Sequence, residues 1–146
     1  MTGLALDPSR SADLTQMHPH RTALMAAESL VAVAAIAGAI QLWAGVSTPP
    51  PEAIEPLGLT TWKLPSVWLF ASVAVPSATA VALLYRRSPS APTAVLVASG
   101  LLATELAVQI PFVGPSALQA VLGSVAVGVA GVALHARRTG WRKGVV

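Results

Sequence analysis

Four long apolar stretches constrain the fold of this chain most strongly. They run over residues 22–45, 64–85, 91–113 and 116–136. A helix that crosses a bilayer needs about 20 apolar residues, and non-helical backbone in the bilayer core would leave its polar groups unsatisfied. The sequence therefore predicts an all-α integral membrane protein, folded as a bundle of four transmembrane helices.

Composition narrows the class further. Only 10% of the 146 residues are charged and 54% are hydrophobic, whereas soluble domains carry about 25% charged residues. Intrinsic disorder requires the opposite balance. The chain contains no cysteine, which excludes a disulfide scaffold and a thiolate metal site. We find no nucleotide-binding or metal-binding motif, so we expect no cofactor and no metal.

The basic residues predict how the bundle is oriented. Eight of the nine flank the apolar stretches on one side, and Lys63 alone lies on the other. Cytoplasmic loops carry the excess of lysine and arginine, so we expect both termini in the cytoplasm. This also accounts for the net charge of +3 without a nucleic acid partner. The excess of arginine over lysine and the abundance of alanine suggest a GC-rich bacterial genome, so we expect the membrane to be a bacterial plasma membrane. The eight residues are Arg10, Arg21, Arg86, Arg87, Arg137, Arg138, Arg142 and Lys143.

The same topology predicts the domain organisation. Residues 1–21 are expected to form a mobile cytoplasmic tail, and residues 137–146 a basic cytoplasmic tail. The membrane domain covers 22–136, and its extracytoplasmic loop, 46–63, is rich in proline. Pro76 lies in the middle of the second stretch and should kink it near Ser72, because proline has no backbone N–H.

Four polar residues are predicted to lie in the outer half of the bilayer. They are Gln41, Glu105, Gln109 and Gln119. Glu105 and Gln109 share a helix face because they are four residues apart. The short connection after the third stretch would bring Gln109 and Gln119 together, and Gln41 would add a third helix.

This group suggests a site for a lipophilic molecule. An apolar environment favours the neutral form of a carboxyl group, which can donate a proton or a hydrogen bond. Glutamines can orient a polar group on a ligand. We therefore take Glu105 as a candidate catalytic residue, with Gln41, Gln109 and Gln119 as substrate-binding residues. The alternative is that these side chains only hold the helices together by hydrogen bonds.

Tryptophans and a second carboxyl group complete the candidates. Trp43, Trp62 and Trp68 should lie near the outer interface, where tryptophan anchors helices. A ligand contact by Trp62 or Trp68 is the alternative, and the loop with Glu52, Glu55 and Trp62 would cover the site. Glu28 lies nearer the cytoplasm as a second candidate catalytic residue. Its alternative role is an ion pair with Arg21, Arg86, Arg87 or His135.

Three classes of function follow from these features. The first is a membrane protein that binds a lipophilic ligand or substrate, with acid–base isomerase, cyclase or hydrolase chemistry as one form. The second is an accessory subunit of a larger membrane complex, and the third is a small proton-coupled exporter. Small residues on the fourth helix, including Ser124, Gly128 and Gly131, allow close helix packing. We expect this face to pack inside the monomer, with homo-oligomer formation as the alternative.

Overall fold

The computed structural model describes residues 8–46 and 48–139, and within them it contains helices and connecting loops but no strand. Residues 1–7 and 140–146 lie outside the described part, and with them Trp141 and two of the basic residues named above. The elements are α1 (Pro8–Ala44), the short 3₁₀ helices η1 (Pro51–Ala53) and η2 (Glu55–Leu57), α2 (Lys63–Leu69), the π-helix η3 (Phe70–Ala74), α3 (Val75–Tyr85), α4 (Ala91–Val113) and α5 (Ala117–Thr139).

Four helical segments are long and apolar enough to cross a membrane. They are His20–Ala44, Lys63–Tyr85, Ala91–Phe112 and Ala117–Arg138. The expectation of four such helices is confirmed, and α4 has the predicted bounds. Helix α1 begins earlier than the first apolar stretch, so the backbone of residues 8–21 is helical.

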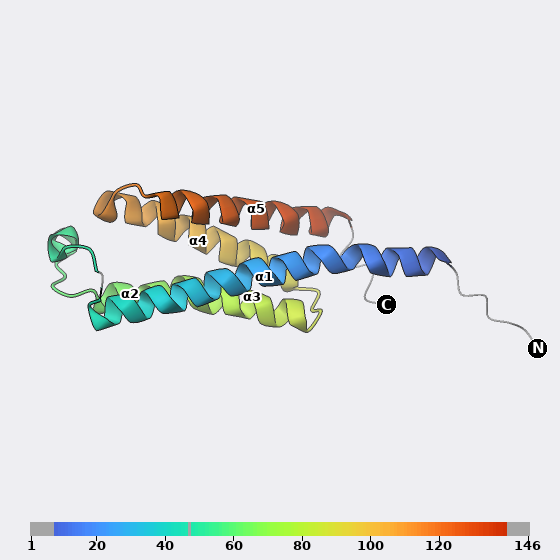
Figure 1. Cartoon of the computed structure of the whole chain (residues 1–146), viewed down its shortest axis with the longest axis horizontal. Coiled ribbons are helices and arrows are strands. Elements are labelled where there is room, and N and C mark those ends of the chain that lie inside the picture. The colour runs from blue at the N-terminus through green and yellow to red at the C-terminus, as the bar shows by residue number, and fades with distance from the viewer. Residues whose placement is uncertain (1–7, 47, 140–146) are drawn as a thin grey trace, which may run out of the picture.

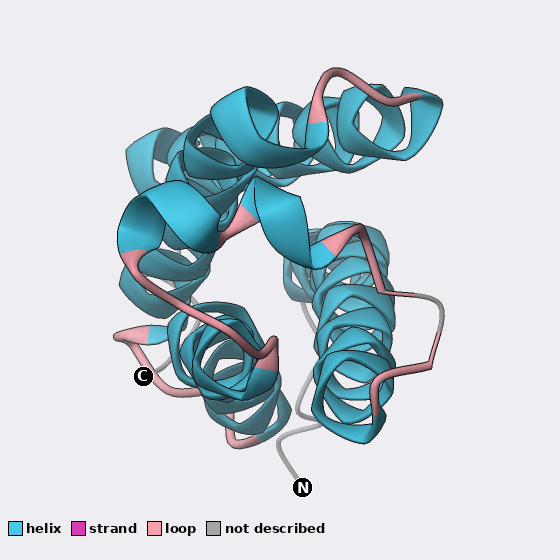
Figure 2. Cartoon of the chain, turned by 90° about the vertical axis from the view of Figure 1, so that its left-hand side faces the viewer, coloured by secondary structure: helices cyan, strands magenta, loops and turns pink. Residues whose placement is uncertain are grey.

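The helices pack in chain order. Helix α1 lies along α2, η3 and α3, α3 packs on α4, and α4 packs on α5, while α1 and α5 contact each other less extensively. The pair α4–α5 diverges from α1–α2 toward the end that carries η1 and η2 (Figure 1). These two short helices lie across that end of the bundle (Figure 2).

Two clusters of buried side chains form the core. The first joins Leu24, Leu84 and Val95 with residues of α5. The second lies further along the bundle and includes Val31, Val73 and Leu102. Many of the remaining buried positions are alanines, whose small side chains let helices approach closely. The end near η1 and η2 lies beyond the second cluster.

Pro76 disturbs the second spanning segment where the sequence predicts, and the disturbance is a π-helix. Because Pro76 cannot donate an N–H, the regular hydrogen-bond ladder is interrupted before it. In η3 the Val75 N–H donates to the Phe70 carbonyl, five residues earlier. One additional residue in a turn rotates the preceding helix by about 100° relative to α3. This rotation sets which side chains of α2 and η3 face α4.

The face of α5 that carries Ser124, Gly128 and Gly131 does not pack inside the monomer, so that expectation is wrong. Ser124, Gly128 and Gly131 are exposed. A Cβ atom added at Gly128 or Gly131 would meet no atom within 4 Å. Helix α5 instead packs through Ala126, Val129 and Ala133, which are buried on its other side.

Candidate functional site

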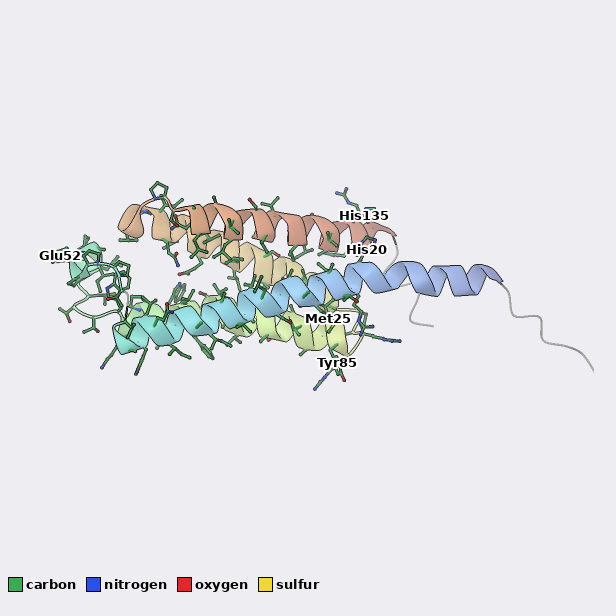
Figure 3. The ribbon with its side chains drawn as sticks, in the orientation of Figure 1. His20, Met25, Glu52, Tyr85 and His135 are labelled. Carbon is green, nitrogen blue, oxygen red and sulfur yellow. The ribbon has the colours of Figure 1, made fainter. Side chains whose placement is uncertain are left out.

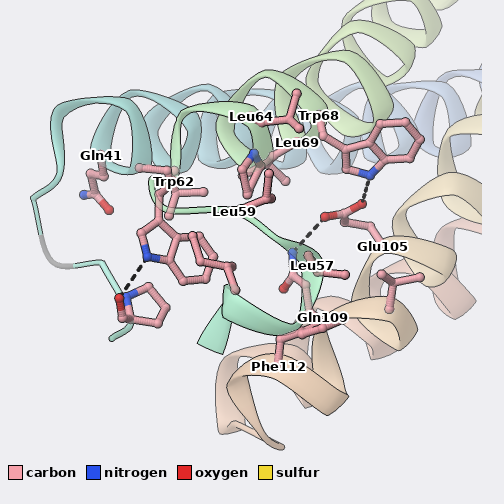
Figure 4. Close-up of a pocket in the computed structure, with 16 residues that line it drawn as sticks. Gln41, Leu57, Leu59, Trp62, Leu64, Trp68, Leu69, Glu105, Gln109 and Phe112 are labelled. Atoms are coloured by element: carbon pink, nitrogen blue, oxygen red, sulfur yellow. Dashed lines mark hydrogen bonds between the residues drawn. The ribbon is translucent and has the colours of Figure 1, made fainter. Parts of the chain in front are cut away.

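Glu105 of α4 is the centre of a hydrogen-bonded group that joins three elements. Its Oε2 accepts hydrogen bonds from Trp68 Nε1 of α2 at 2.8 Å and from Ser72 Oγ of η3 at 3.4 Å. Its Oε1 accepts one from Gln109 Nε2 at 3.0 Å. Figure 4 shows the Trp68 and Gln109 bonds. Only 8% of the Glu105 surface is exposed, so this carboxyl group is held inside the bundle with defined partners.

The group consists of two pairs of side chains. The two members of each pair lie one helical turn apart in the same spanning segment. Glu105 and Gln109 lie on one face of α4, as their spacing predicts. Trp68 and Ser72 lie opposite them, on either side of the junction between α2 and η3. Glu105, Gln109 and Trp68 are candidates from the sequence, whereas Ser72 is expected there only as the position near which Pro76 kinks the helix. The Thr79 hydroxyl donates to the Val75 carbonyl of its own helix, four residues earlier, at 2.8 Å.

Beside Glu105 lies a cavity of about 540 Å³. Sites for small molecules usually have volumes of about 300–1,000 Å³ and mostly apolar walls. Five candidate residues line this cavity, namely Gln41, Trp62, Trp68, Glu105 and Gln109, whereas Gln119 and Glu28 do not. The remaining lining residues are Gly38, Leu42, Pro49, Ile54, Leu57, Leu59, Leu64, Pro65, Leu69, Val108 and Phe112.

Residues 49–62, which we call the cap segment, cover the cavity. Ile54 is only 2% exposed, and Leu57 and Leu59 also line the cavity. The segment is closed on itself, because Trp62 Nε1 donates to the Pro49 carbonyl at 2.9 Å. The sequence predicts a covering loop but not these three apolar contacts. The sequence feature that could have indicated these contacts is the presence of large apolar residues in a proline-rich segment.

Gln41 lies apart from the Glu105 group. In Figure 4 the ring of Trp62 is drawn between Gln41 and the pair Glu105–Gln109. Nearby, the Lys63 ammonium group stands 5.6 Å from the ring centre of Trp43, a distance typical of a cation–π contact. Trp43, Trp62 and Trp68 therefore have three different roles. Trp43 makes a cation–π contact with Lys63, Trp62 donates a hydrogen bond that joins the two ends of the cap segment, and Trp68 donates a hydrogen bond to Glu105.

Gln119 is a helix-capping residue in this structure. The Ser116 N–H donates to Gln119 Oε1 at 2.9 Å, and the Gln119 N–H donates to Ser116 Oγ at 3.2 Å. This reciprocal pair is a capping box, in which a serine and a glutamine three residues later satisfy the first N–H groups of a helix. The Ser-x-x-Gln pattern is visible in the sequence. It could have indicated that Gln119 caps a helix and does not belong to the site with Glu105 and Gln109.

Removal of this cap should weaken α5 without affecting the cavity. We expect Gln119→Ala and Ser116→Ala each to lower the free energy of unfolding by about 1 kcal/mol, because each leaves an N–H group at the start of α5 unpaired. Equilibrium unfolding in mixed micelles measures this loss. A change of ligand binding in either variant, with stability unaltered, would contradict the capping role.

Glu28 occupies a separate buried position. It is 3% exposed and lies between the two core clusters, since Leu24 belongs to one and Val31 to the other. Its polar neighbour is Ser77 of α3, which is 1% exposed. The expected ion pair with an arginine is not found among the described residues, and the Arg21 Nε lacks a hydrogen-bond partner. The two carboxyl groups therefore do not form one site.

The π-helix makes the Glu105 group dependent on Pro76. We expect Pro76→Ala to let the segment 63–85 form a regular α-helix, which would rotate Trp68 away from Glu105 by about 100°. The fluorescence of Trp68, obtained by subtracting the spectrum of a matched Trp68→Phe variant, should then shift. An unchanged Trp68 spectrum would show that tertiary contacts, rather than Pro76, impose the π-helix.

Comparison with protein family models, curated proteins and solved structures finds no match for this chain. The cavity and the Glu105 group are therefore the features from which we infer a function.

Proposed function

We propose that this chain is an integral membrane protein that binds a lipophilic small molecule or substrate in the cavity beneath the cap segment. The observation that carries the proposal is the position of the Glu105 group. A buried carboxyl group with three oriented donors forms part of the wall of a cavity that is otherwise almost wholly apolar. Mostly apolar walls with a few placed polar groups are typical of small-molecule sites.

The distribution of polarity supports a ligand with a polar head and an apolar body. Glu105, Gln109 and Trp68 gather at one part of the lining, as Figure 4 shows. Most of the remaining wall is apolar, and it includes leucines from α1, the cap segment and α2. A polar head placed beside Glu105 would find hydrogen-bond partners, while the apolar body would contact those leucines.

Binding is better supported than acid–base turnover. An isomerase or cyclase that moves a proton between two positions generally uses an acid and a base with distinct environments. Among the described residues that line the cavity, Glu105 is the one ionisable side chain. Glu28, the other buried carboxyl group, lies outside the lining.

Native mass spectrometry of the protein released from mild detergent tests the proposal. We expect a discrete small-molecule adduct on the wild-type chain, and a much smaller adduct on Glu105→Gln. The matched control is Glu52→Gln, which also removes one carboxylate but from an exposed position outside the cavity lining, and it should retain the adduct. A bare wild-type chain, or an adduct equally abundant on Glu105→Gln, would count against the proposal.

We also propose that both termini face the cytoplasm of a bacterial cell. Tyr85 and His135 lie at one end of the bundle and Glu52 at the other (Figure 3). Arg86 and Arg87 directly follow Tyr85 in the chain. Arg137 and Arg138 come shortly after His135. The excess of basic residues favours the cytoplasmic side. Single cysteines at Thr60 and Ser90 test this in intact cells, where an impermeant maleimide should label only the first.

The exposed face of α5 favours a second candidate function, as an accessory subunit or homo-oligomer. Because Gly128 and Gly131 have open space around them, we expect Gly128→Leu to leave the stability of the monomer nearly unchanged. If α5 joins another subunit, the same variant should abolish that association, because small residues permit close contact between membrane helices. Sedimentation of both forms in detergent measures the difference, and equal assembly would exclude this face.

A further inference from the structure

We propose that the cavity selects amphiphiles with a neutral or cationic head and excludes those with an anionic head. This inference rests on the proposed function, because it specifies which class of ligand the same cavity accepts. It follows from the charges around the cavity and from the hydrogen-bonding capacity that remains on Glu105.

The charges at this end of the bundle are mostly negative. The described ionisable side chains there are Glu52, Glu55, Glu105 and Lys63. Lys63 is held over the ring of Trp43 and does not line the cavity. An anionic head beside Glu105 would therefore meet a carboxyl group and no described basic residue in the lining. Like charges repel strongly where water is excluded.

Glu105 can accept one further hydrogen bond. A carboxylate offers about four acceptor positions on its two oxygens. Trp68 and Ser72 donate to Oε2, and Gln109 donates to Oε1. The remaining position on Oε1 suits a hydroxyl or ammonium group, which has a hydrogen to donate. A phosphate or carboxylate head that has lost its protons offers only acceptors.

The apolar part of the ligand is recognised by the cap segment and the helices around it. Leu57 and Leu59 of the cap segment face the cavity together with Leu64 and Leu69 of α2. None of these side chains can pair with a charge, so charge discrimination depends on the Glu105 group. A hydrocarbon chain attached to the head would bury its surface against these leucines.

Three probes with the same hydrocarbon chain test the inference: dodecylamine, dodecanol and dodecyl phosphate. We would titrate each into the wild-type protein in phosphatidylcholine nanodiscs and subtract the heat measured with empty nanodiscs. We expect saturable one-to-one binding of the amine and the alcohol, and binding of the phosphate weaker by about tenfold or more. If none of the three binds, the proposed function fails. If all bind equally, or the phosphate binds best, the inference fails while the proposed function stands.

Two variants test whether Glu105 causes the preference for the amine over the phosphate. In Glu105→Gln the preference for the amine over the phosphate should fall to within about threefold, because the acids that remain are exposed and screened by salt. The Glu52→Gln control should keep the wild-type preference. An undiminished preference in a folded Glu105→Gln protein would overturn the inference. If Glu105→Gln does not fold, the three-probe series on the wild-type protein decides alone.

Discussion

Replacement of Glu105 by leucine is expected to lower the free energy of unfolding by about 3 kcal/mol. The substitution removes the acceptor of three hydrogen bonds, from Trp68, Ser72 and Gln109. An intramolecular hydrogen bond contributes about 1 kcal/mol to stability, so the loss of three bonds accounts for the expected value. Glu105→Gln keeps one acceptor oxygen and should lose about 1 kcal/mol. Equilibrium unfolding in mixed micelles measures both values.

A control one residue away separates this effect from general damage to α4. Thr104 is exposed, and its hydroxyl donates to the Gly100 carbonyl of the same helix at 2.9 Å. Thr104→Val should therefore change stability by less than about 0.5 kcal/mol. If Glu105→Leu were as stable as Thr104→Val, the hydrogen bonds would not contribute to folding. If Glu105→Gln lost stability and still bound its ligand unchanged, Glu105 would only join helices.

The second large effect is expected at Leu84, at the opposite end of the bundle. This side chain is fully buried in the first core cluster. Leu84→Ala should leave a cavity and lower the free energy of unfolding by about 2 kcal/mol, at the low end of the range for buried leucines. The low value follows because lipid is as apolar as the core, so the variant loses packing contacts without gaining exposure to water.

Leu118 supplies the matched control for Leu84. It is a leucine on α5 with 67% of its surface exposed, so Leu118→Ala removes the same atoms where no protein packs tightly against them. Its unfolding free energy should stay within about 0.5 kcal/mol of the wild-type value. Equal losses in the two variants would mean that the helices do not pack as described.

The spanning helices were predictable because length and apolar content are properties of a continuous segment. Helix α4 begins and ends where the proline and glycine residues around it indicate. The pair Glu105–Gln109 was predictable for a similar reason, since both residues belong to one helix and their spacing determines the shared face. Each of these features depends on a single element.

The remaining features depend on how elements are rotated against each other. Ser72 faces Glu105 because of the π-helix before Pro76, and a proline in the sequence does not reveal which way a helix turns around it. Ser124, Gly128 and Gly131 of α5 point outward. Their spacing predicts a close-packing face, but both sides of a membrane helix are apolar, so hydropathy cannot distinguish its inner side. Gln119 was separable in principle, by its capping pattern with Ser116.

The uneven distribution of the core has a mechanical consequence. The two clusters of buried side chains pack the helices together in the middle of the bundle and toward the end where Leu84 lies. The opposite end, beneath the cap segment, encloses a cavity. Regions with few buried contacts open at lower free energy than packed ones. We therefore expect the end that the cap segment covers to open more readily than the end where Leu84 lies. A ligand that enters beneath the cap segment would have to spread only the end that this segment covers and would leave the packed end in place.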